Sequence, residues 1–278
     1  MGNILNAILI QPLLNLLIFI YAVLPGHDFG IAVIIMTVLI RLALWPLASK
    51  QLHSQKKLQA LQPEIAALRK KAGGDKQKEN QMLMELYKEK EINPFSACLP
   101  VLLQFPFLIA LYFVFNQATN DIAKTISNLY GPVQNMPWIK DIAASPNLFK
   151  PSLLGIVSMA APSIALAIFA GVTQFIQVKM ISPKAADTKG DPQAQATAMM
   201  NYLFPAITVF IAWRLPAALP LYWSVTNIVT IIQQKMIMSQ EVEKMEEVKV
   251  VKKTGISNVI KQLPARTKPA KAKKSQKK

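Results

Sequence analysis

Residues 29–48 read FGIAVIIMTVLIRLALWPLA and form a long apolar run. Its twenty residues include a single charge, Arg41. About 20 apolar residues in a helix cross the roughly 30 Å of hydrocarbon in a bilayer. The stretch therefore predicts a transmembrane helix that carries one arginine.

Four more apolar runs of comparable length follow, and none of the five contains Asp, Glu or His. Only Arg214 and Leu215 separate the last two runs, which predicts a tight hairpin that barely leaves the membrane. We therefore expect an all-α polytopic membrane protein with five core transmembrane helices. The four additional spans are predicted at residues 98–116, 152–178, 198–213 and 216–238.

The N-terminal segment, residues 1–28, permits two interpretations. Residues 4–24 are apolar and long enough to span a membrane. However, the polar residues Asn3, Asn6, Gln11 and Asn15 fall on one half of a helical wheel, which favours an amphipathic helix lying in the interface. A cleaved signal peptide is disfavoured, because no Lys or Arg precedes Arg41.

Composition agrees with a membrane protein. Of 278 residues, 52% are hydrophobic and 17% are charged, yet the net charge is +16. A soluble domain normally has about 25% charged residues, so a plain globular enzyme is not expected. Cys98 is the only cysteine, which excludes a disulfide scaffold.

The distribution of Lys and Arg predicts the orientation of the spans. Residues 49–97 contain ten basic residues, residues 235–278 contain thirteen, and residues 1–28 contain none. Basic segments stay in the cytoplasm. We therefore place the 49–97 segment, the 179–197 loop and the 239–278 tail inside, and the 117–151 segment outside as a short cap.

The 49–97 segment is predicted to form a cytoplasmic helical hairpin. Good helix formers fill residues 51–72 and 76–91, and Gly73, Gly74 and Asp75 supply a turn between them. Each helix has an apolar stripe. Either the stripes pack on each other, or part of the hairpin surface meets a substrate or the membrane. The stripes comprise Leu58, Leu61, Ile65 and Leu68 on the first helix and Met82, Leu83, Leu86 and Tyr87 on the second.

The basic tail also permits two interpretations. Residues 249–278 carry eleven basic residues and no acidic one. They are either a topology signal that touches anionic lipid or an arm that binds nucleic acid, with ribosomal RNA as the natural target. The candidate ribosome- or lipid-binding residues are Lys252, Lys253, Arg266, Lys268, Lys271, Lys273 and Lys274.

Arg41 is the candidate functional residue inside the membrane. An arginine at this depth costs about 2.5–3.5 kcal/mol on insertion scales. It either snorkels to the cytoplasmic headgroups or lines a water-filled cavity. Because the apolar runs contain no acid, a fixed ion pair within the bundle is not expected. Polar partners available to Arg41 are Gln104, Gln174, Gln177, Tyr222, Ser224, Thr226 and Asn227.

The sequence offers no pattern typical of an enzyme. It contains no phosphate-binding glycine loop, no GxSxG motif and no metal-ligand cluster, and His27 and His53 are isolated. We expect neither catalytic residues nor a cofactor or metal.

Several motifs resemble the YidC family of membrane protein insertases, in order and over about residues 11–238. The chain resembles a compact bacterial form of that family, related to the mitochondrial and chloroplast insertases. One departure is Ala218, where the family usually has glycine. The matching motifs are residues 29–42, Pro46-Leu47, residues 61–65, Asp75-Lys76-Gln77, Leu86-Tyr87-Lys88, Asn93-Pro94, residues 98–100 and 103–106, residues 201–205, Leu215-Pro216-Ala217, Leu221-Tyr222-Trp223, Asn227 and Gln233-Gln234.

The resemblance implies five spans around a hydrophilic groove that is open to the cytoplasm, with Arg41 in the groove. It implies that the hairpin helps to receive substrates, and that the second and fifth spans guide them into lipid. It also favours an interfacial N-terminal helix. The groove residues expected are Arg41, Gln104, Gln174, Gln177, Tyr222, Trp223 and Asn227, and the hairpin residues expected are Pro63, Glu64, Asp75 and Tyr87.

The function implied is insertion of newly made membrane proteins into the cell membrane. The partners expected are nascent membrane proteins, membrane lipids and, through the tail, the ribosome; a Sec-type translocon stays open. Two alternatives remain, namely a small-solute transporter or channel and an assembly chaperone without insertion activity. A transporter would show inverted repeats, and no clear internal repeat is visible.

Overall fold

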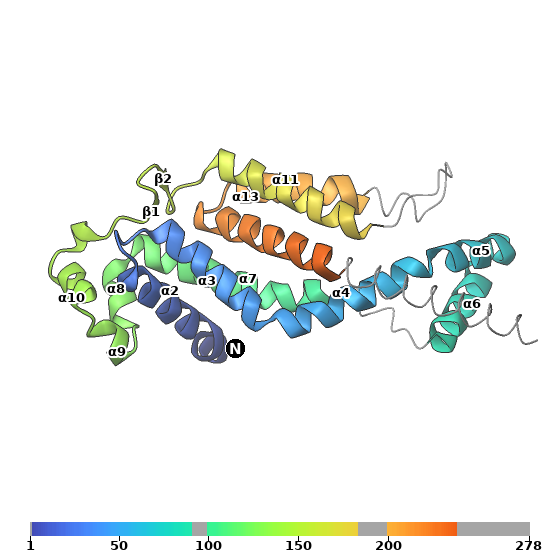
Figure 1. The fold of residues 1–278 in the computed structure, drawn as a ribbon, viewed down its shortest axis with the longest axis horizontal. Helices are drawn as coiled ribbons and strands as arrows, with labels where there is room; N and C mark the ends of the chain where they lie inside the picture. Colours follow the sequence, from blue (N-terminus) through green and yellow to red (C-terminus); the bar gives the residue numbers. More distant parts are fainter. Residues whose placement is uncertain (1, 91–98, 183–198, 238–278) are drawn as a thin grey trace, which may run out of the picture. The chain divides into compact units, whose positions relative to one another are not determined.

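The computed structural model describes residues 2–90, 99–182 and 199–237 (Figure 1). Most of the regular structure in these ranges is helical, as the sequence predicts. The chain divides into two units after Lys235, and of the second unit only residues 236 and 237 are described. The predicted basic tail, including all of its candidate binding residues, and most of the 179–197 loop lie outside the described residues.

The chain begins with helical segments α1 (Gly2–Leu5), one π-helical turn η1 (Asn6–Ile10) and α2 (Gln11–Val23). Helix α2 packs on α3 and α7. Asn15 is buried, and its Oδ1 accepts a hydrogen bond from the Tyr130 backbone N–H at 2.6 Å. The polar half of the predicted wheel is therefore not simply an exposed face, because Asn15 binds another segment of the chain.

Residues 29–60 form two helices. Helix α3 (Phe29–Ala43) begins after Asp28, whose Oδ1 accepts the Ile31 N–H at 2.8 Å and so caps the helix. Helix α4 (Trp45–Ala60) follows after a break at Leu44, and the two helices are bent by 68°. The predicted span 29–48 thus ends as a straight helix at Ala43.

Length and composition single out few spanning helices in the described part of the chain. One unbroken helical segment, Asn6–Val23, is long and apolar enough to cross a membrane. The bent pair α3 and α4 qualifies only when both helices are taken together. The five spans expected from the sequence stay a prediction.

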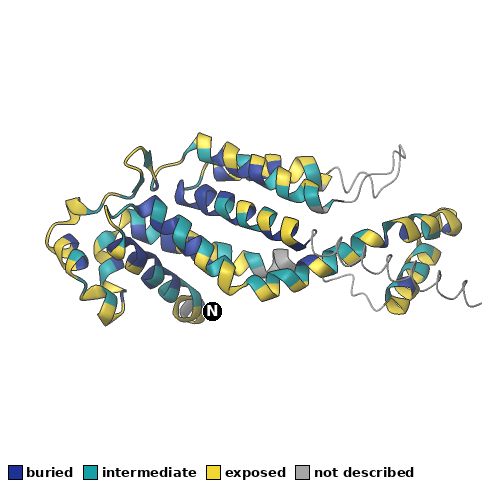
Figure 2. Cartoon of the chain, viewed as in Figure 1, coloured by how far each residue is buried: buried dark blue, intermediate teal, exposed yellow. Residues whose placement is uncertain are grey.

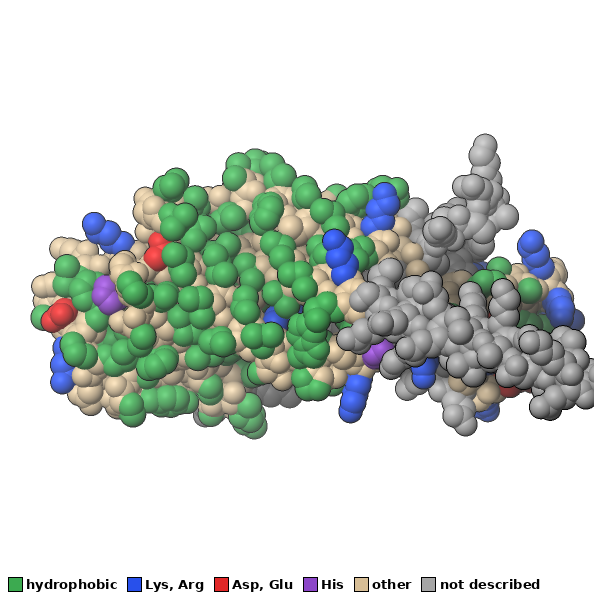
Figure 3. All heavy atoms as spheres, viewed as in Figure 1, with side chains coloured by type: hydrophobic (Ala, Val, Ile, Leu, Met, Phe, Trp, Pro, Cys, Tyr) green, Lys and Arg blue, Asp and Glu red, His purple; other side chains and the backbone are tan. Residues whose placement is uncertain are grey.

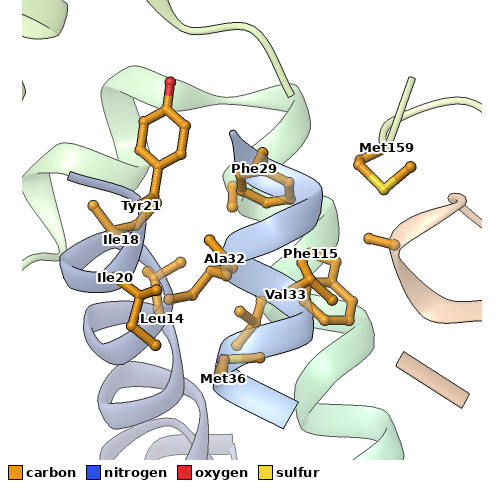
Figure 4. Packing of buried hydrophobic residues seen from close by; sticks show 14 of the residues in the cluster. Leu14, Ile18, Ile20, Tyr21, Phe29, Ala32, Val33, Met36, Phe115 and Met159 are labelled. Atoms are coloured by element: carbon orange, nitrogen blue, oxygen red, sulfur yellow. The ribbon is translucent and has the colours of Figure 1, made fainter. Parts of the chain in front are cut away.

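One hydrophobic core joins α2 and α3 to later parts of the chain (Figures 2 and 4). Leu14 and Ile18 of α2 and Ala32 of α3 all belong to this buried cluster. Phe115 of α7 (Leu99–Asn120) packs into the same cluster. The last described helix, residues 218–237, contributes Leu219 and Tyr222.

The 62–89 region forms the expected helical hairpin, from α5 (Gln62–Ala72) and α6 (Lys76–Glu89). Gly73 and Gly74 have φ of 64° and 91°, the left-handed region that glycine tolerates best. The packing of the two apolar stripes on each other is confirmed, since Leu61, Ile65 and Leu86 form their own small core. The first helix of the predicted hairpin is broken at Leu61 into α4 and α5.

The 117–151 cap contains three short helices and a 3-10 turn. They are α8 (Ile122–Ser127), α9 (Gly131–Gln134), α10 (Pro137–Ala144) and η3 (Pro146–Leu148). His27 stacks on Trp138 of α10 with ring centroids 4.0 Å apart. The cap is therefore tied to the α2–α3 connection.

The structure differs from the prediction at residues 152–163. Instead of the first turns of a helix, the chain forms a hairpin of β1 (Ser152–Leu153) and β2 (Val157–Ser158). Helix α11 (Ile164–Ile181) begins only after Ser163. Pro162 forms an isolated bridge with Pro216, so this segment is paired as extended chain.

The remaining helices complete the bundle. The π turn η4 (Met199–Leu203) leads into α13 (Phe204–Ala212), which packs along α11. A Cβ added at Gly171 would stand 2.2 Å from the Val209 Cγ2, so glycine lets these two helices approach closely. A turn at residues 213–217 then leads to helix 218–237.

Candidate functional site: polar residues between α3, α7 and the last helix

Arg41 lies in the last turn of α3, three residues before the 68° break. Its side chain is half-buried. Within residues 2–90, 99–182 and 199–237, no side chain forms an ion pair or hydrogen bond with its guanidinium. The five donors of the guanidinium are therefore not committed to the fold.

Two other predicted groove residues lie next to each other. The Gln104 Nε2 of α7 donates a hydrogen bond to the Tyr222 hydroxyl at 3.0 Å, which joins α7 to helix 218–237. Tyr222 is buried, and it lies within electrostatic range of Arg41. The structure thus brings Arg41, Gln104 and Tyr222 into one region from three different helices.

Asn227 belongs to a different contact. Its Nδ2 donates to the Thr173 Oγ1 at 3.1 Å and to the Ala170 carbonyl at 3.3 Å, both on α11. Thr173 in turn donates to the Phe169 and Ala170 carbonyls. Because these groups are buried and paired, Asn227 links two helices in this structure and does not present a free amide.

The other predicted groove residues are half-buried. Gln174 and Gln177 lie on α11, and Trp223 lies on helix 218–237 and packs against the main hydrophobic core. Among the described residues, none of these three side chains is hydrogen-bonded to Arg41.

The last helix contains a polar pair that the sequence prediction of the groove did not include. Gln233 and Gln234 are buried, and both side-chain polar atoms of each lack a hydrogen-bond partner in the described structure. The buried Thr226 hydroxyl oxygen also lacks a hydrogen-bond partner in the described structure. Unpaired buried polar groups are costly and call for an explanation. The available signal was the presence of two consecutive glutamines in an apolar run.

The four predicted hairpin residues have evident structural roles. Pro63 lies in the first turn of α5, and the Glu64 carboxylate pairs with Lys90 at 3.2 Å. The Asp75 Oδ1 caps α6 by accepting the Gln77 and Lys78 N–H groups at 2.9 and 3.2 Å. Tyr87 packs on the hairpin core. The Glu64–Lys90 pair and the packing of Tyr87 join the two helices, whereas Asp75 caps α6.

The surface has the character expected of a membrane protein. Hydrophobic side chains cover a broad area of the face seen in Figure 3. A shallow apolar pocket of about 250 Å³ lies between α11 and α13 and is lined by Ile168, Phe175 and Val209 among others. None of the predicted groove residues lines it. No group of three or more potential metal ligands occurs in the described ranges.

Comparison with known proteins decides the family. Residues 19–245 match the model of the 60Kd inner membrane protein family. This range contains α3, α7, α11, α13, the last described helix and every groove residue considered above. The chain belongs to the 60Kd inner membrane protein family.

Relatives in this family carry the name membrane protein insertase YidC. The chain is 37% identical over 216 residues to the protein of Clostridium tetani, covering 76% of this chain and 84% of that protein. It is 33% identical over 240 residues to the protein of Methylobacterium nodulans, covering 85% of this chain and 36% of that one. For Aliivibrio salmonicida the identity is 35% over 227 residues, with 82% and 36% covered. The chain thus spans about a third of the length of the latter two relatives.

Proposed function

We propose that the chain is a membrane protein insertase, which receives the polar part of a newly made membrane protein and releases its apolar segment into lipid. Membership in the 60Kd inner membrane protein family and the name of its relatives support this proposal. The observation that carries it is Arg41, a half-buried arginine without a partner among the described residues.

An arginine held in this way suits reception of polar peptide. Each unsatisfied backbone group costs several kcal/mol in hydrocarbon, so polar substrate segments need partners on their way through. The Arg41 guanidinium offers five donors, and Tyr222 and Gln104 supply further polar groups nearby. We propose that these residues line a groove open to the cytoplasm, together with Gln174, Gln177 and Trp223. Asn227 joins two helices beside this groove.

Gln233 and Gln234 extend this proposed polar path. Their amide groups can both donate and accept, so they can pair with either backbone group of an extended peptide. They lie 11 and 12 residues after Tyr222 on the same helix. At 1.5 Å per residue this places them about 17 Å further along its axis.

Exposed apolar side chains support the release step. Phe105, Ile109 and Phe113 of α7 are exposed, and so are Ile228 and Ile232 of the last helix. We propose that an apolar substrate segment leaves along these two helices, because its burial in lipid is favourable by about 0.8 kcal/mol per CH₂ group.

The charge of the α5–α6 hairpin and of the basic tail suggests which partners these two segments bind. We propose that the α5–α6 hairpin faces the cytoplasm and first meets the substrate. We propose that the basic residues of 249–278 bind either the ribosome or anionic lipid. Salt-dependent co-sedimentation with ribosomes, compared between the full chain and a chain ending at residue 248, distinguishes these two partners.

Reconstitution tests the proposed function. The full chain in phospholipid vesicles should make newly synthesised one- and two-span proteins protease-protected, whereas empty vesicles should not. Arg41→Ala should reduce insertion of substrates with polar translocated segments, and Arg41→Lys should retain part of it because the charge remains. Arg214→Ala is a matched control, since Arg214 is exposed over the Phe210 ring.

Three outcomes would contradict the proposal. Equal protection in empty vesicles would remove the insertase role, and unchanged insertion by both Arg41 variants would make Arg41 a snorkelling residue. Flux of small solutes through the same vesicles without insertion would favour a transporter.

A further inference from the structure

The β1–β2 hairpin ends in an exposed apolar tip. Its strands pair Ser152 with Ser158 and Leu153 with Val157. The turn between them exposes 65% of Leu154 and 83% of Ile156. The value for Ile156 is the highest of any large hydrophobic residue in the described part of the chain. Such exposure of apolar side chains is unfavourable in water, so we expect lipid or another molecule to cover the tip.

The base of this hairpin is fixed to the start of α3. The Asp28 carboxylate accepts the Leu154 N–H with Oδ2 and the Ile31 N–H with Oδ1. Gly30 leaves room for Leu153, since a Cβ on Gly30 would stand 2.5 Å from the Leu153 Cβ. These contacts fix the position of the tip relative to α3.

A second set of contacts holds the chain just after the hairpin. The Ala217 N–H donates to the Ala161 carbonyl at 3.0 Å, and the Ala218 N–H donates to the Met159 carbonyl at 3.2 Å. Met159 is fully buried. The tip is therefore held in its exposed position by well-packed residues on both sides of it, and it is not part of a loose loop.

The surroundings of the tip in the sequence point to lipid. No ionisable residue occurs from Pro151 to Val178, between Lys150 and Lys179. Helix α11 has 18 residues, which rise about 27 Å, and Lys179 lies in its last turn. Its uncharged part is thus shorter than the roughly 30 Å of hydrocarbon.

Helix α11 also has exposed apolar side chains, like the tip of the β1–β2 hairpin. Ile164, Ile168 and Val172 on this helix are all exposed. Adding Leu154 and Ile156 before Ile164 lengthens the uncharged apolar surface at the N-terminal end of α11. A helix that is too short for the bilayer otherwise requires local thinning or other adjustment.

We propose that the β1–β2 hairpin is a lipid anchor, whose tip residues Leu154 and Ile156 insert among the acyl chains next to the headgroups at the N-terminal end of α11. The anchor completes the apolar thickness that α11 lacks. It requires that the chain resides in a membrane, as its family does, and it does not depend on the insertase activity.

Fluorescence quenching tests the anchor in the full-length protein. With Cys98→Ser as background, Ile156→Cys is labelled with an environment-sensitive fluorophore, and the protein is reconstituted into phosphatidylcholine–phosphatidylglycerol vesicles. We expect strong quenching by lipid with a nitroxide near the top of the acyl chain. Quenching by aqueous iodide should be at least severalfold weaker than for the free dye.

A label on an exposed position of the cap is the matched control. Lys140→Cys on α10 lies in a polar, exposed position, so we expect iodide to quench its label and nitroxide lipid to have little effect. Thermal unfolding of both labelled proteins should match that of the Cys98→Ser parent, because neither side chain supports the fold.

Two results would overturn the anchor. If iodide quenches the label at position 156 as strongly as that at position 140, the tip lies in water. If both quenchers fail at position 156, the tip lies against protein, and oxidative dimerisation of the unlabelled Ile156→Cys protein would identify a second copy as the occupant.

Discussion

Gly30 shows how one missing side chain positions a distant segment. Leu153 lies against the first turn of α3, where an added Cβ would stand 2.5 Å from the Leu153 Cβ and 2.8 Å from its backbone α-carbon. The backbone atom cannot move aside as a flexible side chain would. The hairpin and α3 can therefore be this close only with glycine at residue 30.

Replacing Gly30 by alanine should destabilise the fold. Overpacking of this kind typically costs about 1–3 kcal/mol, and we expect a lower Tm for Gly30→Ala in detergent or vesicles. Gly131→Ala is the control, because a Cβ there meets nothing within 4 Å. Equal Tm values for the two variants would show that the β1–β2 hairpin does not pack against α3 as described.

Asn15 is the second residue that joins distant segments. Its Oδ1 accepts the Tyr130 N–H at 2.6 Å, and its Nδ2 donates to the Gln11 carbonyl at 2.8 Å. Asn15→Leu leaves the Tyr130 N–H without this partner, a loss that costs about 1–3 kcal/mol when the group is buried. We expect a measurable fall in Tm, and little change for Asn135→Leu, whose amide is exposed.

At the scale of elements, the α5–α6 hairpin has a core of its own. Leu61, Ile65 and Leu86 are buried against one another, and the Arg69 Nε pairs with Glu79 at 2.8 Å beside them. A core this small depends heavily on each member. The hairpin should therefore open as one unit, separately from the main hydrophobic core.

Removing one core side chain should open the whole hairpin. Large-to-small core replacements cost about 2–5 kcal/mol, so Ile65→Ala should raise amide hydrogen exchange throughout α5 and α6 while α3 stays protected. Met84→Ala, on the exposed side of α6, should leave exchange unchanged. Raised exchange confined to the turn around residue 65 would contradict a cooperative unit.

The elements also show what sequence reasoning could and could not predict. The turn at Gly73 and Gly74 and the apolar stripes beside it followed directly from residue types. The β1–β2 hairpin did not, because residues 152–163 are as apolar as a span. Gly155, with φ of 70°, and Pro162 were the available signals of a non-helical start. The prediction of a span rested on apolar composition, which does not register the effect of one glycine and one proline on the backbone.

The candidate site was predictable in part for a similar reason. Arg41 stood out as a lone charge in an apolar run, and the Gln104–Tyr222 contact agrees with their expected proximity. Asn227 was expected to face the groove but pairs with Thr173. The sequence cannot tell a free amide from one paired across two helices, because both occur in polar positions of apolar helices.

At the scale of the whole molecule, the distribution of charge predicts opposite sides for the hairpin and the cap. Lys78 of α6 and Lys140 of α10 are both exposed. In a Cys98→Ser background, a membrane-impermeant maleimide should label Lys140→Cys on intact cells. It should label Lys78→Cys only in inverted membrane vesicles. Labelling of both from one side would exclude an odd number of spans between them.

The contacts that complete the molecule join residues far apart in the chain. Asn15 and Tyr130 are separated by 115 residues, Gln104 and Tyr222 by 118, and Asp28 and Leu154 by 126. At about 5–20 residues per second, a ribosome needs about 6–25 s to make the later partner of the last pair. During that interval the earlier residue of each pair lacks its later partner in the chain. The new copy is then in the same position as the proteins that it is proposed to insert.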